Sequence, residues 1–270
     1  MDSVSIQHQI YSTVYHTGEQ DNPWLVMVHG FTHDHTYFRR QIEEFQRDYR
    51  VLAVDLRGHG QSTHIPGPFG VEEYADDIQA VLDNAGIRQA IYWGTHTGSA
   101  IGLILALRQP ERFSSLILEG TFLPGFPMPR VGELINRARA VIREKGLQAA
   151  RDDWFEHADW FDHINRNPEA CRAQEHRELV NHFEGGPWLT DLQARPVTPA
   201  ADHLQKIRQP VLLYNGMDDL EDFKRAADFL SQNLPCTRRE VIPNAGGFPG
   251  WENPDTVNNL VRGFLNQSIS

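Results

Sequence analysis

The chain has 270 residues, of which 40% are hydrophobic and 23% charged, and its formal net charge at pH 7 is -11. This length accommodates one large α/β domain with a well-buried core. The acidic balance disfavours nucleic acid and anionic membranes as partners, because both require a basic surface.

The cysteines and the apolar runs indicate where such a chain works. Cys171 and Cys236 are the two cysteines, and they form neither a disulfide framework nor a CxxC site. The segment from Met1 to Gly18 lacks the apolar core of a signal peptide, and no apolar run is long enough to cross a bilayer. We therefore expect a cytoplasmic protein whose partner is a small molecule.

Strand and helix patterns alternate along the first half of the chain. Continuous apolar runs, typical of strands buried on both faces, cover Trp24–Val28, Arg50–Asp55 and Ala90–Trp93. Helical spacing covers Glu72–Ala85, and an apolar helix is predicted over Ala100–Arg108.

The second half returns to the same alternation after an interruption. Strands are predicted over Ser115–Gly120, Pro210–Gly216 and Arg239–Pro243, and Val257–Leu265 is predicted as a closing helix. This order indicates an α/β fold with a doubly wound, mostly parallel sheet.

The interruption spans residues 121–201, contains an amphipathic helix near Val131–Lys145 and carries no strand signal. We predict that it is a helical cap inserted into a core domain made of residues 1–120 and 202–270. Ligand sites of open sheets lie at the carboxyl ends of the strands, so a cap inserted there would cover the site.

The segment Ile91–Ala100 carries the clearest functional signal. It has the pattern of a buried strand, a sharp turn between Gly94 and Gly98, and the start of an apolar helix. This is the frame of a nucleophile elbow, G-x-S-x-G, whose central serine sits on a strained turn. In this chain the central residue is His96.

The whole chain resembles the α/β-hydrolase superfamily, of the capped esterase, lactonase and C–C hydrolase type. Four further segments carry the resemblance, in the order expected: an HG loop, a D-x-R-G-x-G-x-S loop, a G-x-x-D loop for the triad acid, and a loop that bears the triad histidine (His29–Phe31, Asp55–Ser62, Gly216–Asp219 and Pro243–Pro254). The resemblance implies an oxyanion hole formed by the backbone N–H groups of Phe31 and Thr97.

Two of the three triad positions depart from the family pattern. His96 stands where the family has Ser, Cys or Asp, and Gly247 stands where P-x-A-G-H places the histidine, whereas Asp219 keeps the acid position. A Ser-His-Asp mechanism needs a nucleophile hydrogen-bonded to a general base, and the matching positions supply neither. Thr95 and Thr97 flank His96, but we expect their side chains to diverge from the nucleophile direction.

His96 is therefore the candidate catalytic group. The positive end of the following helix and partial burial both disfavour imidazolium, so we expect a neutral ring. Neutral imidazole acts as a nucleophile or general base near neutral pH. Glu119 and Asp219 are the candidate carboxylate partners, and the oxyanion donors do not depend on side-chain identity.

Other residues are candidates for contact with the substrate (His29, His33, Thr121, Trp154, Trp160 and Trp188). The spacing of His33 and His35 is not a recognised zinc pattern, so no metal is expected, and the resemblance implies no cofactor.

Three hypotheses remain open from the sequence. The first is an atypical enzyme that acts on a small, mostly apolar carbonyl or ester compound through His96, by hydrolysis, C–C cleavage, or a cofactor-free lyase, cyclase or oxygenase step. The second is a catalytically inactive protein that keeps a ligand pocket. The third is an engineered variant whose natural parent has a serine at position 96 or a histidine at position 247. The oligomeric state, a homodimer included, stays open.

Overall fold

A computed structural model describes residues 10–268 of the chain, so the first nine residues of the polar segment Met1–Gly18 lie outside the described part. Seven strands form one sheet in the order β1-β3-β2-β4-β5-β6-β7. β1 pairs antiparallel with β3, and all other neighbours are parallel. The predicted doubly wound, mostly parallel sheet is confirmed. The strands are β1 (Ser12–Tyr15), β2 (Trp24–Val28), β3 (Arg50–Val54), β4 (Ala90–Thr95), β5 (Phe113–Glu119), β6 (Val211–Gly216) and β7 (Thr237–Ile242).

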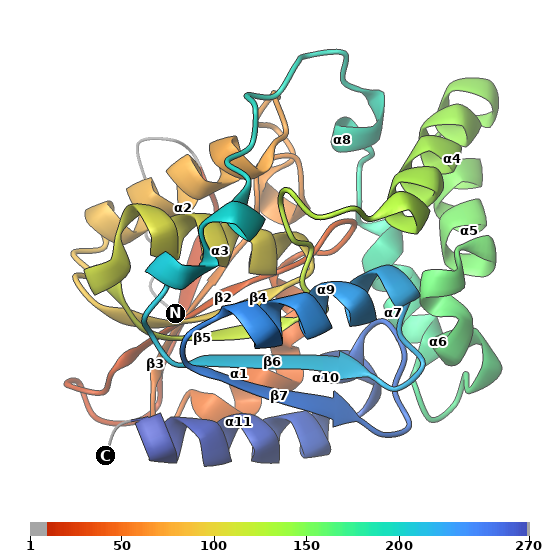
Figure 1. Cartoon of the computed structure of the whole chain (residues 1–270). Helices are drawn as coiled ribbons and strands as arrows, with labels where there is room; N and C mark the ends of the chain where they lie inside the picture. Colours follow the sequence, from red (N-terminus) through yellow and green to blue (C-terminus); the bar gives the residue numbers. More distant parts are fainter. Residues whose placement is uncertain (1–9, 269–270) are drawn as a thin grey trace.

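Helices cover both faces of this sheet (Figure 1). Alternate residues of a strand face opposite sides of the sheet, so the central strands contribute to two separate apolar clusters. In β2, Val26 and Val28 belong to the cluster that contains apolar residues of α2 and α3, whereas Leu25 and Met27 belong to the cluster that contains those of α1 and α11. The helices outside the long insertion are α1 (Arg39–Phe45), α2 (Val71–Asn84), α3 (Thr97–Arg108), α9 (Glu221–Asn233), α10 (Pro249–Glu252) and α11 (Pro254–Ser268).

The segment between β5 and β6 is helical, and its described residues 121–201 contain no strand. Its helices lie beyond the carboxyl ends of the strands, and the chain after them runs back past α2 to the amino end of β6 (Figure 1). Its longest helix, α4, buries Val131, Leu134, Ala138 and Ile142, the spacing of one apolar helix face. The helices of this segment are α4 (Pro129–Lys145), α5 (Leu147–His157), α6 (Asp162–Arg166), α7 (Ala173–Asn181) and α8 (Gly186–Leu189).

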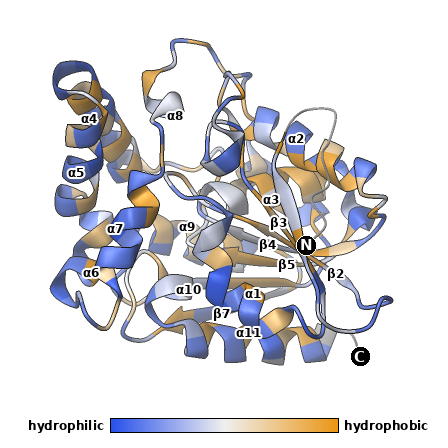
Figure 2. Cartoon of the chain, turned by 180° about the vertical axis from the view of Figure 1, so that it is seen from behind, coloured by the Kyte–Doolittle hydropathy of each residue, from blue (hydrophilic) through white to orange (hydrophobic). Residues whose placement is uncertain are grey.

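Hydropathy follows the layers of the fold. Figure 2 shows hydrophobic strands at the centre and outer helices such as α11 with a hydrophilic outer surface. No helix within residues 10–268 combines the length and apolarity needed to cross a membrane.

Candidate functional site

His96 sits on a strained turn between β4 and α3. Its backbone has φ 47° and ψ -104°, a conformation that costs a non-glycine residue free energy and that clusters at functional sites. Gly94 and Gly98 permit the turn: a Cβ on Gly94 would overlap the Gly98 carbonyl, and one on Gly98 would overlap the Val28 oxygen. The His96 N–H donates to the Glu119 carbonyl at 2.9 Å, which ties the turn to β5. The elbow frame is therefore intact around an unusual residue.

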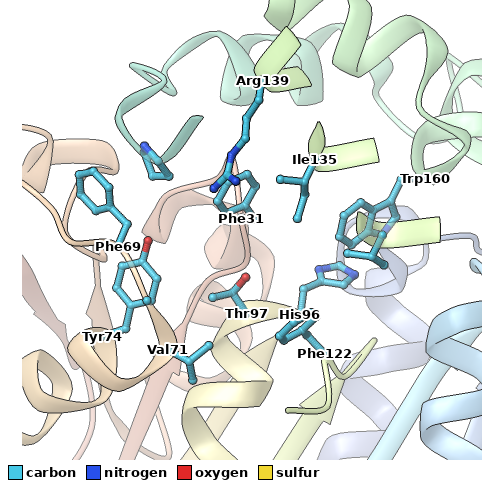
Figure 3. A pocket seen from close by; sticks show the side chains of 13 residues that line it. Phe31, Phe69, Val71, Tyr74, His96, Thr97, Phe122, Ile135, Arg139 and Trp160 are labelled. Carbon is cyan, nitrogen blue, oxygen red and sulfur yellow. The ribbon is translucent and has the colours of Figure 1, made fainter. Parts of the chain in front are cut away.

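A cavity of about 170 Å³ opens beside this turn. His96, Thr97, Phe31 and Trp160 line it, and the rest of its wall is mostly apolar (Figure 3). The side chain of Thr97 also reaches this cavity. An engineered cavity of similar size in another protein binds benzene, so this one suits a small molecule.

The imidazole of His96 lies in an aromatic cage. The ring centroids of Trp160, Phe223 and Phe248 are 4.9, 5.1 and 5.2 Å from its own. Burial lowers the pKa of His96 from 6.5 to about 3; His33 acts in the same direction, and a contact with the backbone of Gly247 opposes it. In the part of the chain that the structure describes, no hydrogen-bond partner reaches the Nε2 atom of His96. The ring is therefore neutral at physiological pH, as the sequence led us to expect.

The indole of Trp160 fills the space beside Gly247. A Cβ on Gly247 would overlap Trp160 Cδ1 and would lie 2.7 Å from the Trp160 carbonyl oxygen and 2.8 Å from Nε1. Both values are far below the separation of about 3.5–4.0 Å that non-bonded heavy atoms prefer. Position 247 thus has no histidine, and a histidine side chain would not fit there unless Trp160 moved.

Neither candidate carboxylate partner contacts His96, which corrects that expectation. Asp219 accepts hydrogen bonds from Asn215 Nδ2 and the Leu220 N–H, both at 2.7 Å. Glu119 accepts from the Tyr37 hydroxyl at 2.5 Å and from the Gly250 N–H at 3.0 Å. The carboxyl oxygens of Asp219 and Glu119 therefore already accept hydrogen bonds from other residues, and these bonds fix the loops at Leu220 and Gly250.

Burial raises the pKa values of three carboxyl groups near the site. Those of Glu119 and Asp219 rise to about 7, and that of Glu252 rises to about 8. Glu252, to which the sequence reasoning gave no role, accepts from the N–H groups of Gly246 and Phe248 on the loop that contains Gly247. Raised carboxyl pKa values mean that the folded chain retains protons that the unfolded chain releases. Their contribution to stability is present at acid pH and is lost as the pH rises through about 7 to 8.

The two predicted oxyanion donors remain unoccupied. The N–H groups of Phe31 and Thr97 have no hydrogen-bond acceptor within the described residues, and both residues line the cavity. Thr97 is the first residue of α3, where a helical N–H points away from the helix without an intrahelical partner. The loop of Phe31 approaches the elbow closely, since a Cβ on Gly30 would lie 3.0 Å from His96 Nδ1.

A buried histidine pair fixes the loop that carries Phe31. His33 Nδ1 lies 2.8 Å from the Phe31 carbonyl, and His33 Nε2 lies 2.7 Å from Nε2 of His176 on α7. Because a carbonyl only accepts, Nδ1 of His33 carries the proton, and its Nε2 accepts from His176. Burial lowers the pKa of both rings. His176 had no motif around it in the sequence that could have revealed this contact.

Among the six residues predicted to contact substrate, Trp160 alone lines this cavity. Both ring nitrogens of His29 are engaged, by the Gly30 carbonyl at 2.7 Å and the Leu56 N–H at 3.0 Å. Trp154 donates to Thr32 at 3.2 Å and packs against Trp188, so these indoles hold the helical segment onto the loop of Phe31. His33 contacts His176 instead, and Thr121 is buried outside the cavity wall. Five of the six residues therefore contact other parts of the protein and do not line the cavity.

Asp34, His35 and Asp55 place possible metal-ligating atoms within 4.8 Å of one another. These atoms already serve the protein: Asp55 accepts from the N–H groups of His35 and Gln61, and Asp34 accepts from the Thr36 N–H. The cluster therefore has a structural explanation in the loops that flank the elbow.

The sheet order, the elbow and the cavity at the strand ends define an α/β enzyme fold with its pocket at the nucleophile turn. A family model described as the alpha/beta hydrolase fold matches residues 23–254, and the chain belongs to this family. It is related to enol-lactonases and carbamate hydrolases. It is 29% identical over 254 residues to 3-oxoadipate enol-lactonase 2 of Acinetobacter baylyi, covering 92% of this chain and 90% of that protein. It is 26% identical over 264 residues to the putative carbamate hydrolase RutD of a Caulobacter species, covering 95% of each.

Solved structures share the same fold. The enol-lactonase from Burkholderia xenovorans superposes with a TM-score of 0.82 at 22% identity, over 98% of this chain and 100% of that one. A thermophilic esterase from Thermogutta terrifontis superposes with a TM-score of 0.81 at 24% identity, over 100% of both chains.

Proposed function

We propose that this chain is an enzyme that acts on a small, mostly apolar carbonyl or ester compound without a Ser-His-Asp triad. In this proposal the substrate oxygen lies on the N–H groups of Phe31 and Thr97, and His96 serves as general base or nucleophile. The observation that carries it is the juxtaposition, on one cavity wall, of two N–H donors without an acceptor in the described residues and a neutral imidazole whose Nε2 atom has no partner there. The relatives support a carbonyl substrate, since their names describe lactone and carbamate cleavage.

The chemistry of an ester substrate follows from these groups. As a base, a ring nitrogen of His96 takes a proton from water while the water oxygen attacks the carbonyl carbon, and the ester C–O bond then breaks. The departing alkoxide takes that proton back from the imidazolium. Each N–H donor aimed at the developing oxyanion contributes about 3 kcal/mol. The negative charge formed beside His96 raises the pKa of the ring as the reaction proceeds, which offsets its low value in the empty cavity.

The helical segment 121–201 acts as a cap in this proposal, because Trp160 brings it against His96. Asp219 and Glu119 have positioning roles, since their oxygens hold Leu220 and Gly250 in place. The reaction requires a small-molecule partner and no cofactor.

A second candidate function is ligand binding without turnover. The observation that favours it is the position of Trp160, which occupies the space beside Gly247 and leaves Asp219 without a histidine to orient. The cavity and its donors would then bind a carbonyl compound and release it unchanged.

Hydrolysis of short 4-nitrophenyl esters distinguishes the two candidates. We expect wild-type turnover well above that of denatured protein, which has the same histidine content, and a loss of about 100-fold or more in His96→Ala. His157→Ala is the matched control, because His157 is an exposed histidine at the end of α5, lies 3.6 Å from Asp153 and does not line the cavity. Rates of wild type and His96→Ala that both equal the rate of denatured protein, with ligand binding retained, would favour the second candidate.

A further inference from the structure

Two polar groups at the cavity have no hydrogen-bond or ion-pair partner among residues 10–268. The hydroxyl of Tyr74 is buried, with the residue 3% exposed, and it makes no hydrogen bond. Arg139 of α4 also lines the cavity, and no ion pair or hydrogen bond engages it within the described residues. A buried polar group without a partner is costly, so Tyr74 indicates that something else completes its hydrogen bond.

Arg139 differs in this respect from its neighbours on the same helix. Arg130 pairs with Asp159, Arg137 with Asp153, and Arg143 with Asp191 (Arg130, Arg137 and Arg143 are the other arginines of α4). The chain carries a net charge of -11, so acidic partners are abundant. An unpaired guanidinium at the cavity is therefore the local exception on an acidic molecule, and it is available to an anion.

The two groups lie on the part of the cavity away from His96. Figure 3 shows the Tyr74 hydroxyl and the Arg139 guanidinium both directed into the pocket, with His96 and Trp160 at its other end. Phe31, Val71 and Ile135 supply the apolar wall between these two ends, and Phe69 lies beyond Tyr74. A ligand that satisfies all of these groups has a carbonyl near His96, an apolar body, and an anionic oxygen at the opposite end.

We propose that Arg139 and Tyr74 form a carboxylate subsite, so that the substrate of this pocket is a small apolar carbonyl compound with an acid group at its far end. This inference rests on the proposed function for the identity of the pocket. A guanidinium and a phenol both donate hydrogen bonds, and hydrogen bonds to a charged acceptor are shorter and stronger than neutral ones. The carboxylate thus satisfies the Tyr74 hydroxyl and neutralises Arg139 in one contact.

The test measures binding of two ketones by isothermal titration calorimetry at neutral pH. 4-Acetylbenzoate and 4-acetylbenzamide have nearly the same shape, differ in charge, and contain no ester to hydrolyse. We expect wild type to bind the acid about tenfold more tightly than the amide. Arg139→Gln and Tyr74→Phe should each weaken the acid by about fivefold and leave the amide unchanged. Arg143→Gln is the matched control and should change neither.

Equal affinities in wild type, a preference that survives in both variants, or no heat from either ketone would overturn the subsite. The result is separable from the catalytic proposal, because binding of a ketone requires no turnover. If the acid preference depends on Arg139 and Tyr74 while His96→Ala hydrolyses esters as fast as wild type, the subsite stands and the role given to His96 fails. If His96 is needed for hydrolysis but the acid preference is absent, the reverse holds.

Discussion

Replacing Gly247 by alanine tests whether Trp160 fills the space beside position 247, where the family pattern has the catalytic histidine. The new Cβ would overlap Trp160 Cδ1 and lie 2.7 Å from the Trp160 carbonyl oxygen. Overpacking of this kind costs about 1–3 kcal/mol. For a chain of this size the melting temperature should fall by about 2–12 °C. The assay is thermal unfolding followed by circular dichroism, repeated in urea to obtain the free energy of unfolding.

We also expect the substitutions at Gly247 and Trp160 to be coupled, because the two residues are in contact. Trp160→Ala alone should cost about 3–5 kcal/mol, as truncation of a buried aromatic ring does. In that background Gly247→Ala should cost about 1 kcal/mol less than in wild type, because the indole overlap is gone while the carbonyl contact remains. Gly263→Ala is the control, since nothing lies within 4 Å of its Cβ on a helix and the change should stabilise by about 0.5–1 kcal/mol. A Gly247→Ala protein as stable as wild type, with no coupling to Trp160, would refute the reasoning.

Buried histidines, carboxyl groups and one phenol hydroxyl should affect stability and activity in ways that can be measured. Stability should be greatest near neutral pH. Between about pH 4 and pH 6.5, four buried histidines whose pKa values are lowered to about 3 to 4 make stability rise with pH, and they outnumber the three carboxyl groups with raised pKa values, which oppose them (His29, His33, His59 and His96; Glu119, Asp219 and Glu252). Above about pH 6.5 the carboxyl groups act without this opposition, so stability falls until about pH 8. Urea midpoints across this range check the shape, and a steady rise to pH 8 would contradict it. Asp219→Asn should lower kcat/KM for an activated ester less than tenfold, whereas loss of a working triad acid costs about 10⁴-fold. Tyr74→Phe should leave the urea midpoint unchanged or raised, because its hydroxyl has no partner to lose; a clear drop would mean that a partner exists.

The sequence predicted the parts of the fold that depend on local pattern. The apolar run Trp24–Val28 is β2 with the bounds expected, and Arg50–Val54 and Ala90–Thr95 differ from the prediction by one or two residues. β1 was not predicted, because it is a short edge strand of four residues with two threonine or serine positions and little apolar signal. α1 was also not predicted, since its sequence RRQIEEF offers two buried apolar residues in seven.

The sequence predicted the parts of the site that depend on the local backbone. It did not predict the contacts between side chains that are far apart in the chain. The glycines around His96 placed the elbow, and burial of His96 followed from its position after a buried strand. The contact of Trp160 with His96 joins residues that are far apart in the chain, so no spacing rule could have revealed it. The same holds for the pair of His33 and His176, which depends on how α7 packs.

The central claim is that the ring of His96 takes part in the reaction, and chemical rescue tests it most directly. His96→Ala leaves a hole among Trp160, Phe223 and Phe248 that free imidazole can enter. We predict that imidazole restores ester hydrolysis by His96→Ala saturably and above its rate with denatured protein, while His157→Ala needs no rescue. A His96→Ala protein that hydrolyses the ester as fast as wild type, with no response to imidazole, would contradict the claim.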